Sequence, residues 1–105
     1  VLATVMSRAA PDRGAIDAGS KAFQLDMNRY PITVGIKGVE VIKFSEEHGW
    51  LKITGEAQKK IKLGDKLEFI PYHVCTCVNQ FDTMYIVRNN KVEHEWQIKA
   101  RGKMV

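Results

Sequence analysis

Apolar and polar residues alternate along this chain in short runs, and turn-forming residues separate one run from the next. Runs of about four to eight residues that are rich in β-branched side chains are typical of strands. Residues 21–29 fit either a short helix or an irregular loop. The pattern predicts an all-β fold of about seven to eight short strands with little helix, folded as a small, partly closed barrel or a sandwich. The segments with the strand pattern are residues 1–7, 13–18, 32–36, 39–45, 50–54, 66–70, 84–87 and 92–98.

The last two of these segments are expected to form a hairpin. Asn89 and Asn90 lie between them, and asparagine tolerates the positive φ angles that a two-residue turn requires. In the second strand Val92, His94 and Trp96 alternate with polar residues, which is typical of a strand with one face on a core. We therefore expect this strand to be half-buried and His94 to be a core histidine with its hydrogen bonds satisfied.

The length and composition are those of one globular domain. The chain has 105 residues, of which 45% are hydrophobic and 27% are charged. No apolar run approaches the roughly 20 residues of a membrane-spanning helix. The net charge of +4 is spread out, and its one cluster, residues 59–62, precedes a Gly-Asp turn. We expect that cluster to be a solvated loop, with neither a nucleic acid nor a membrane as partner.

The two cysteines favour a reducing compartment. Cys75 and Cys77 are separated by one residue, a spacing at which a disulfide would be strained. The first residues of the chain also lack the basic region and the length of a signal peptide. These features predict a cytoplasmic protein.

Residues 71–82 contain the densest group of metal-ligating side chains. If this stretch is extended, His73, Cys75 and Cys77 share one face, because side chains repeat every two residues in a strand. An imidazole with one or two thiolates suits zinc, with one position left for water or substrate. The alternative is a buried histidine beside two small hydrophobic cysteines. Spacing alone leaves both interpretations open.

A second polar group lies between the segments 39–45 and 50–54, which we expect to pair as a hairpin. This break contains Glu46, Glu47 and His48. Glu46 and His48 are candidates for a general acid or base near a metal ion. The alternative is a charged hairpin tip without a catalytic role.

Four motifs in order resemble the C-terminal domain of the D-threonine aldolase and D-serine dehydratase family. They are SRAAPDR at 7–13 with DAGSKA at 17–22, SEEHG at 45–49, GD at 64–65 with IPYHVCT at 70–76 and VN at 78–79, and ARG at 100–102. The resemblance covers nearly the whole chain. Tyr72, Cys77 and residues 23–28 depart from the family pattern, and the departure at Cys77 leaves its part in metal binding open.

The resemblance implies a single β domain, residues 1–105, of a larger fold-type III enzyme. In that family an N-terminal (β/α)₈ barrel, absent from this chain, holds pyridoxal phosphate on a lysine, and the full-length enzyme is a homodimer. The C-terminal domain holds a divalent ion through a His-x-Cys pair, which matches His73 and Cys75. The cysteine form is similar to the zinc-binding pattern, with manganese as the alternative metal.

The resemblance also implies a lyase that acts on D-amino acids with a β-hydroxyl group. The cofactor serves as electron sink, and the ion is a Lewis acid for charge that develops on the hydroxyl oxygen. Cleavage of Cα–Cβ gives glycine and an aldehyde, as in D-threonine aldolase. Loss of the hydroxyl gives pyruvate and ammonia from D-serine, and this dehydratase reaction is the alternative. The isolated chain is expected to be inactive, and a third possibility is a non-catalytic metal-binding, ligand-binding or dimerisation module.

Overall fold

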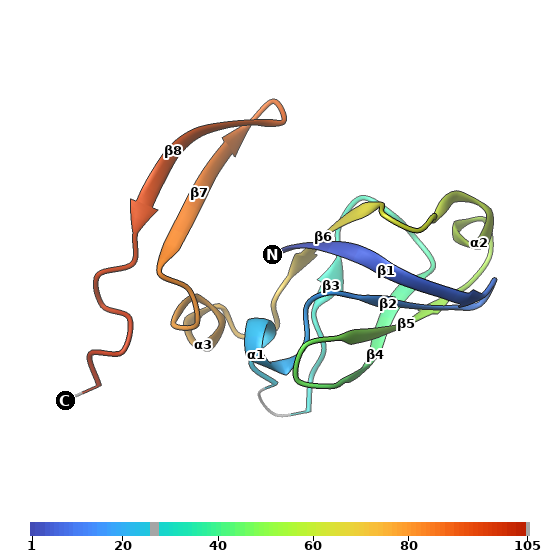
Figure 1. The fold of residues 1–105 in the computed structure, drawn as a ribbon, viewed down its shortest axis with the longest axis horizontal. Coiled ribbons are helices and arrows are strands. Elements are labelled where there is room, and N and C mark those ends of the chain that lie inside the picture. The colour runs from blue at the N-terminus through green and yellow to red at the C-terminus, as the bar shows by residue number, and fades with distance from the viewer. Residues whose placement is uncertain (26–27, 105) are drawn as a thin grey trace.

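A computed structural model describes residues 1–25 and 28–104, in which eight strands and three short helices follow one another (Figure 1). Residues 26–27 of the ambiguous segment 21–29 lie outside the described residues, and the helix α1 occupies its start. The eight strands and three short helices of the described residues confirm the predicted mainly-β fold class. The elements are β1 (Leu2–Ala10), β2 (Arg13–Ile16), α1 (Ser20–Phe23), β3 (Ile32–Thr33), β4 (Val39–Phe44), β5 (Gly49–Ile53), α2 (Ala57–Lys60), β6 (Lys66–Ile70), α3 (Val74–Val78), β7 (Thr83–Arg88) and β8 (Lys91–Gln97).

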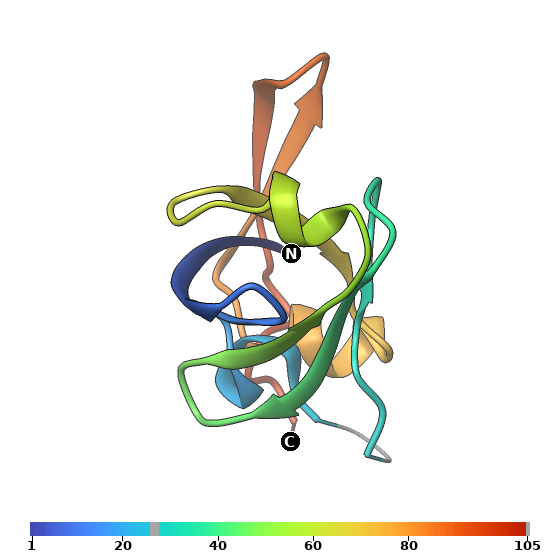
Figure 2. The same cartoon turned by 90° about the vertical axis from the view of Figure 1, so that its right-hand side faces the viewer.

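Six strands form one antiparallel sheet in the order β3-β6-β1-β2-β5-β4. The two edge strands of this sheet approach each other, and the hydroxyl of Thr33 donates a hydrogen bond to the main-chain oxygen of Val39, 2.9 Å away. The sheet therefore curls into a nearly closed barrel (Figure 2). The predicted hairpin between residues 39–45 and 50–54 is confirmed as β4–β5.

The barrel core follows from alternation along the strands. In β5 the residues Gly49, Leu51 and Ile53 are buried, and the two residues between them are exposed. Phe23 of α1 is also buried in this core, and its ring stacks on that of Phe44 with centroids 5.3 Å apart. The buried apolar residues of the barrel are Ala3, Val5, Ile16, Ala18, Phe23, Val39, Val41, Leu51, Ile53, Ala57, Ile61, Leu67 and Phe69.

The strands β7 and β8 form a separate two-stranded hairpin that projects from the barrel (Figures 1 and 2). Asn89 and Asn90 have φ angles of 49° and 61°, as the sequence predicted for this turn. Every residue of β8 is exposed, so the prediction of a half-buried strand with His94 in the core is wrong. Alternation showed that one face is apolar, but the barrel does not cover that face.

Two of the helices replace structures that the sequence suggested. A solvated loop was expected at residues 59–62, but Lys59 and Lys60 end the helix α2, which the buried Ala57 anchors against the barrel. The helix α3 falls within residues 71–82, for which the metal hypothesis assumed an extended chain. In the described part of the chain no helix has the length and hydropathy needed to cross a membrane.

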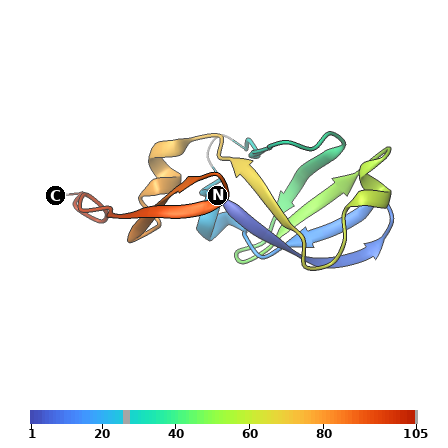
Figure 3. The ribbon, with the colours of Figure 1, turned by 90° about the horizontal axis from the view of Figure 1, so that it is seen from above.

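The short helices lie at opposite ends of the molecule. Seen from above, α1, α3 and the β7–β8 hairpin occupy one end of the barrel, whereas α2 lies at the other (Figure 3). The described residues span 45 × 33 × 18 Å, and the projecting hairpin contributes to this elongated shape.

Candidate functional site

His73 lies at the point where the chain leaves β6 and enters α3. Its backbone is extended, with φ −121° and ψ 103°, and the next residue begins the helix. The main-chain oxygen of His73 accepts hydrogen bonds from the hydroxyl of Thr76 at 3.1 Å and from the amide of Cys77 at 3.3 Å. These bonds close the first helical turn. The assumption that residues 73, 75 and 77 share one face of an extended strand is therefore wrong.

The helix separates the two cysteines. Residues two apart in a helix point about 200° away from each other. Cys75 is exposed, whereas Cys77 is only 3% exposed and its thiol donates a hydrogen bond to the main-chain oxygen of Ala22 at 3.2 Å. Burial raises the pKa of the Cys77 thiol, which disfavours the thiolate that a metal needs. Cys77 thus serves packing, whereas Cys75 is exposed and His73 is half-buried.

Glu46 and His48 lie in the turn between β4 and β5, and both side chains are exposed. The main chain of this turn holds α1: the amides of Ser20 and Lys21 donate to the oxygens of Ser45 and Glu46 at 2.9 Å and 3.1 Å. The side chains of Lys21 and Glu47 form an ion pair, and the Glu47 carboxylate raises the pKa of Lys21 above its ordinary value.

The helix α1 therefore connects the two candidate groups. It binds the β4–β5 turn through its amides and α3 through the bond between Ala22 and Cys77. Within residues 1–25 and 28–104, no three His, Cys, Asp or Glu side chains gather closely enough to hold an ion. The β4–β5 turn and α3 thus lie at the same end of the molecule (Figure 1), but in the described residues their side chains form no set of three metal ligands.

Sequence reasoning missed one cation at this end of the molecule. The guanidinium carbon of Arg29 lies 5.5 Å from the centre of the Tyr72 ring, next to His73 in sequence. A guanidinium over an aromatic face retains its donors, and these can bind a carboxylate. The two residues are far apart along the chain, so no local motif could have indicated the contact.

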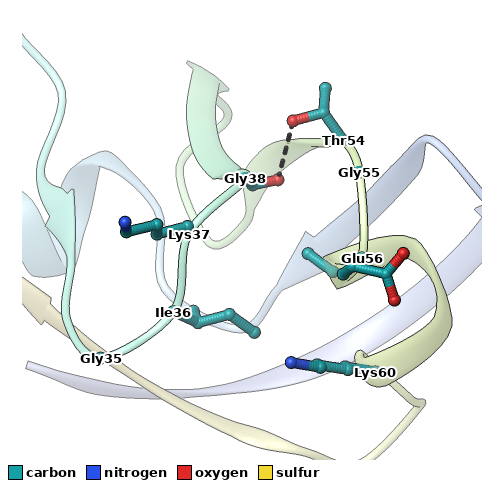
Figure 4. Close-up of a pocket in the computed structure, with 9 residues that line it drawn as sticks. Gly35, Ile36, Lys37, Gly38, Thr54, Gly55, Glu56 and Lys60 are labelled. Atoms are coloured by element: carbon teal, nitrogen blue, oxygen red, sulfur yellow. Dashed lines mark hydrogen bonds between the residues drawn. The ribbon is translucent and has the colours of Figure 1, made fainter.

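An open depression of the described surface lies elsewhere. It has a volume of about 540 Å³ and lies beside α2, between the loop before β4 and the end of β5 (Figure 4). The side chains of Lys37, Glu56 and Lys60 border it, and the hydroxyl of Thr54 donates to the oxygen of Gly38 at its rim. None of the candidate residues lines this depression. Its lining residues are Gly35, Ile36, Lys37, Gly38, Thr54, Gly55, Glu56, Ala57 and Lys60.

Relatives in three organisms are similar to almost the whole chain. The 3-hydroxy-D-aspartate aldolase of Paracoccus denitrificans is 39% identical over 103 residues, and the D-threonine aldolase of Arthrobacter sp is 39% identical over 102. The chain spans 26% of the length of each of these two enzymes. An uncharacterized protein of Mycobacterium tuberculosis is 30% identical over 111 residues, and the chain spans 83% of it.

The fold agrees with these relationships. The crystal structure of D-threonine aldolase from Filomicrobium marinum superposes on 100% of the chain with a TM-score of 0.90 and 33% identity, and the chain covers 28% of that protein. The family described as Putative serine dehydratase domain matches residues 1–87, which include β1 to β6, α3 and most of β7. The resemblance seen in the four sequence motifs is thereby confirmed, and the chain belongs to the serine dehydratase domain family.

Proposed function

We propose that this chain is the metal-binding domain of a pyridoxal-phosphate lyase that cleaves D-amino acids with a β-hydroxyl group to glycine and an aldehyde. The observation that carries the proposal is 39% identity, over 97–98% of the chain, to two enzymes named as aldolases. Those enzymes are about four times as long, so the proposal includes an N-terminal (β/α)₈ barrel that binds the cofactor and the D-amino-acid substrate. It also includes a homodimer in the cytoplasm, the location that two free thiols favour.

In this proposal His73 and Cys75 hold the ion. One imidazole and one exposed thiol at the start of α3 are donors that suit zinc, with manganese as the alternative. They supply two of about four positions of a tetrahedral zinc site, so the remaining positions belong to water, substrate or another part of the enzyme. When bound, the ion would act as a Lewis acid for the β-hydroxyl oxygen of the substrate.

Glu46 and His48 would exchange the proton of that hydroxyl. Both are exposed, and α1 joins their turn to α3 by main-chain and thiol hydrogen bonds. A carboxylate or a neutral imidazole that reaches a hydroxyl can act as its general base. Either residue fits this role only if the assembled enzyme brings the β4–β5 turn to the substrate.

Two other functions have specific support. The description of the family favours the dehydratase reaction, which would release ammonia instead of glycine. The short mycobacterial relative, of which the chain spans 83%, favours a module that functions without a cofactor-binding barrel.

Metal content tests the ligand pair. The purified chain is dialysed against zinc and then analysed for bound metal, beside the variants His73→Ala, Cys75→Ala and Cys77→Ala. We expect zinc to be lost with His73→Ala and Cys75→Ala and retained with Cys77→Ala, which is the matched control. Equal zinc in all three variants would contradict the assignment, and the same comparison with manganese identifies the preferred metal.

A chimera tests the reaction. This chain replaces the matching quarter of the Paracoccus denitrificans aldolase, and glycine and ammonia are measured after addition of D-threonine or D-3-hydroxyaspartate. Glycine release that requires His73 supports the aldolase, whereas ammonia release supports the dehydratase. We expect the 105-residue chain alone to turn over neither substrate nor D-serine, and turnover by the chain alone would contradict the proposed division of labour.

A further inference from the structure

The β7–β8 hairpin presents an apolar face that the barrel leaves open. Met84 pairs with Trp96, and Ile86 pairs with His94. Cross-strand partners, and residues two apart in a strand, point to the same side of a ribbon. These four residues, here called the hairpin face, therefore form one surface. Trp96 is 59% exposed, which is unusual for the largest apolar side chain.

The hairpin is attached to the rest of the chain at its base. The amide of Ile98 donates to the oxygen of Asp82 at 2.8 Å, and the guanidinium of Arg101 forms an ion pair with the Asp82 carboxylate at 3.1 Å. The amide of Gly102 donates to the side-chain oxygen of Asn79 at 3.1 Å, next to the end of α3. A two-stranded hairpin without further packing is marginally stable in water. Among residues 1–25 and 28–104 the contacts given for the hairpin lie at its base, so a surface that covers it would stabilise it.

We propose that the hairpin face docks on the remainder of the longer lyase polypeptide, which makes the hairpin the arm that fixes α3 at the interface. This inference rests on the proposed function. The two aldolase relatives contain about three times as much chain outside the matched region as within it. The Filomicrobium marinum aldolase superposes over 100% of this chain, hairpin included, so the same arrangement recurs in a protein of which this domain is 28%.

Docking of the arm would also place the candidate ligands. The hairpin begins directly after α3, and the bond between Gly102 and Asn79 holds the returning chain at the end of that helix. A partner that covers Trp96 therefore lies beside the helix that carries Cys75 and starts at His73. Any coordination position that another part of the enzyme supplies would then lie at this interface.

A second copy of this chain is a poorer occupant. Two copies could pair antiparallel through the free edges of their β8 strands. In a register centred on His94, Val92 of one copy lies opposite Trp96 of the other. From the sequence positions, the same register would place Glu93 opposite Glu95 of the other copy, and like charges directly opposite destabilise a strand pair. Charged side chains on an edge strand are also a common device against self-association.

Hydrogen exchange tests the inference in the 105-residue chain and in chimeras built on the Paracoccus and Arthrobacter aldolases. Mass spectrometry follows peptides from β7–β8, with β5 peptides as the reference for folding. We expect hairpin amides to exchange at least about tenfold more slowly in the chimera than in the chain alone. The variant Trp96→Glu should abolish this difference, whereas Trp50→Glu, which changes the 49% exposed tryptophan of the barrel, should not.

Three results would overturn the docking arm. The first is equal exchange of the hairpin in the chain and the chimeras, and the second is slow exchange in the chain alone at low concentration. The third is protection in the chain alone that rises with concentration, which would identify a second copy as the occupant. Glycine release measured on the same chimera separates this inference from the proposed function, because a protected hairpin in an inactive chimera would contradict only the lyase.

Discussion

The thiol of Cys77 and the main-chain oxygen of Ala22 lie 3.2 Å apart, and this hydrogen bond joins α3 to α1 across 55 residues of sequence. The contact explains why two cysteines that are separated by one residue differ in character. One thiol is fixed inside the domain, and the other remains available to solvent.

Loss of the buried thiol should weaken the domain. We expect Cys77→Ala to lower the free energy of unfolding by about 1 to 2 kcal/mol, because a packed atom and a hydrogen bond are lost. Cys75→Ala, at an exposed position, should change it by no more than about 0.5 kcal/mol. Urea denaturation of both variants measures the difference. Equal effects would show that Cys77 is not packed as described.

The same burial predicts a pH dependence. The folded-state pKa of Cys77 is raised by burial, so the folded chain retains this proton at a pH where the unfolded chain releases it. The contribution to stability is fully present below the unfolded pKa, about 8.5, and declines as the pH rises above it. Cys77→Ala should flatten this decline in denaturation curves recorded from pH 7 to alkaline pH, whereas Cys75→Ala should leave it unchanged.

Gly19 is required by the close approach of α1 to the β4–β5 turn. A Cβ atom at this position would overlap the main-chain oxygens of Ser45 and Glu46. We expect Gly19→Ala to lower the free energy of unfolding by about 1 to 3 kcal/mol, since the helix must move away from the turn. The neighbouring Ser20→Ala adds no atom and should have little effect. A tolerated alanine at position 19 would show that the α1 contact is not tight.

The turn of the hairpin depends on left-handed backbone angles. Asn90 has a φ angle of 61°, which a β-branched residue adopts only with strain. Asn90→Val should disfavour the hairpin by about 1 kcal/mol, and Asn90→Gly should preserve it. The strand population of β7–β8 from NMR chemical shifts measures this, and global unfolding should stay constant. A large change in barrel stability would indicate that hairpin and barrel fold as one unit.

Two isoleucines, one buried and one exposed, allow the barrel core to be tested. Ile53 is fully buried in β5, whereas Ile70 at the end of β6 is 54% exposed. Ile53→Ala should lower the free energy of unfolding by about 2 to 5 kcal/mol because it leaves a cavity, and Ile70→Ala by less than about 1 kcal/mol. Thermal and urea unfolding report both values. A similar loss at the two positions would contradict the barrel core.

Much of the barrel was predictable because its signals are local. Runs of β-branched residues marked the strands, and the Asn89–Asn90 turn marked a hairpin that the structure confirms. The helix α3 was not predictable in the same way. Its sequence, Val-Cys-Thr-Cys-Val, consists of residues with modest helix propensity, so local preference favoured a strand. The helix is stabilised by the Thr76 hydroxyl at its start and by the distant contact of Cys77 with α1.

The sequence by itself determined the strand class, both hairpin turns, the family and the His73–Cys75 pair as the candidate ligands. Only the tertiary structure decided that Cys77 points inward, that Glu46 and His48 stand on a turn bound to α1, and that Trp96 faces solvent. The physical reason is that periodicity identifies the residues that share a side of an element. It does not reveal whether another element, distant in sequence, covers that side, because burial is a property of the assembled fold.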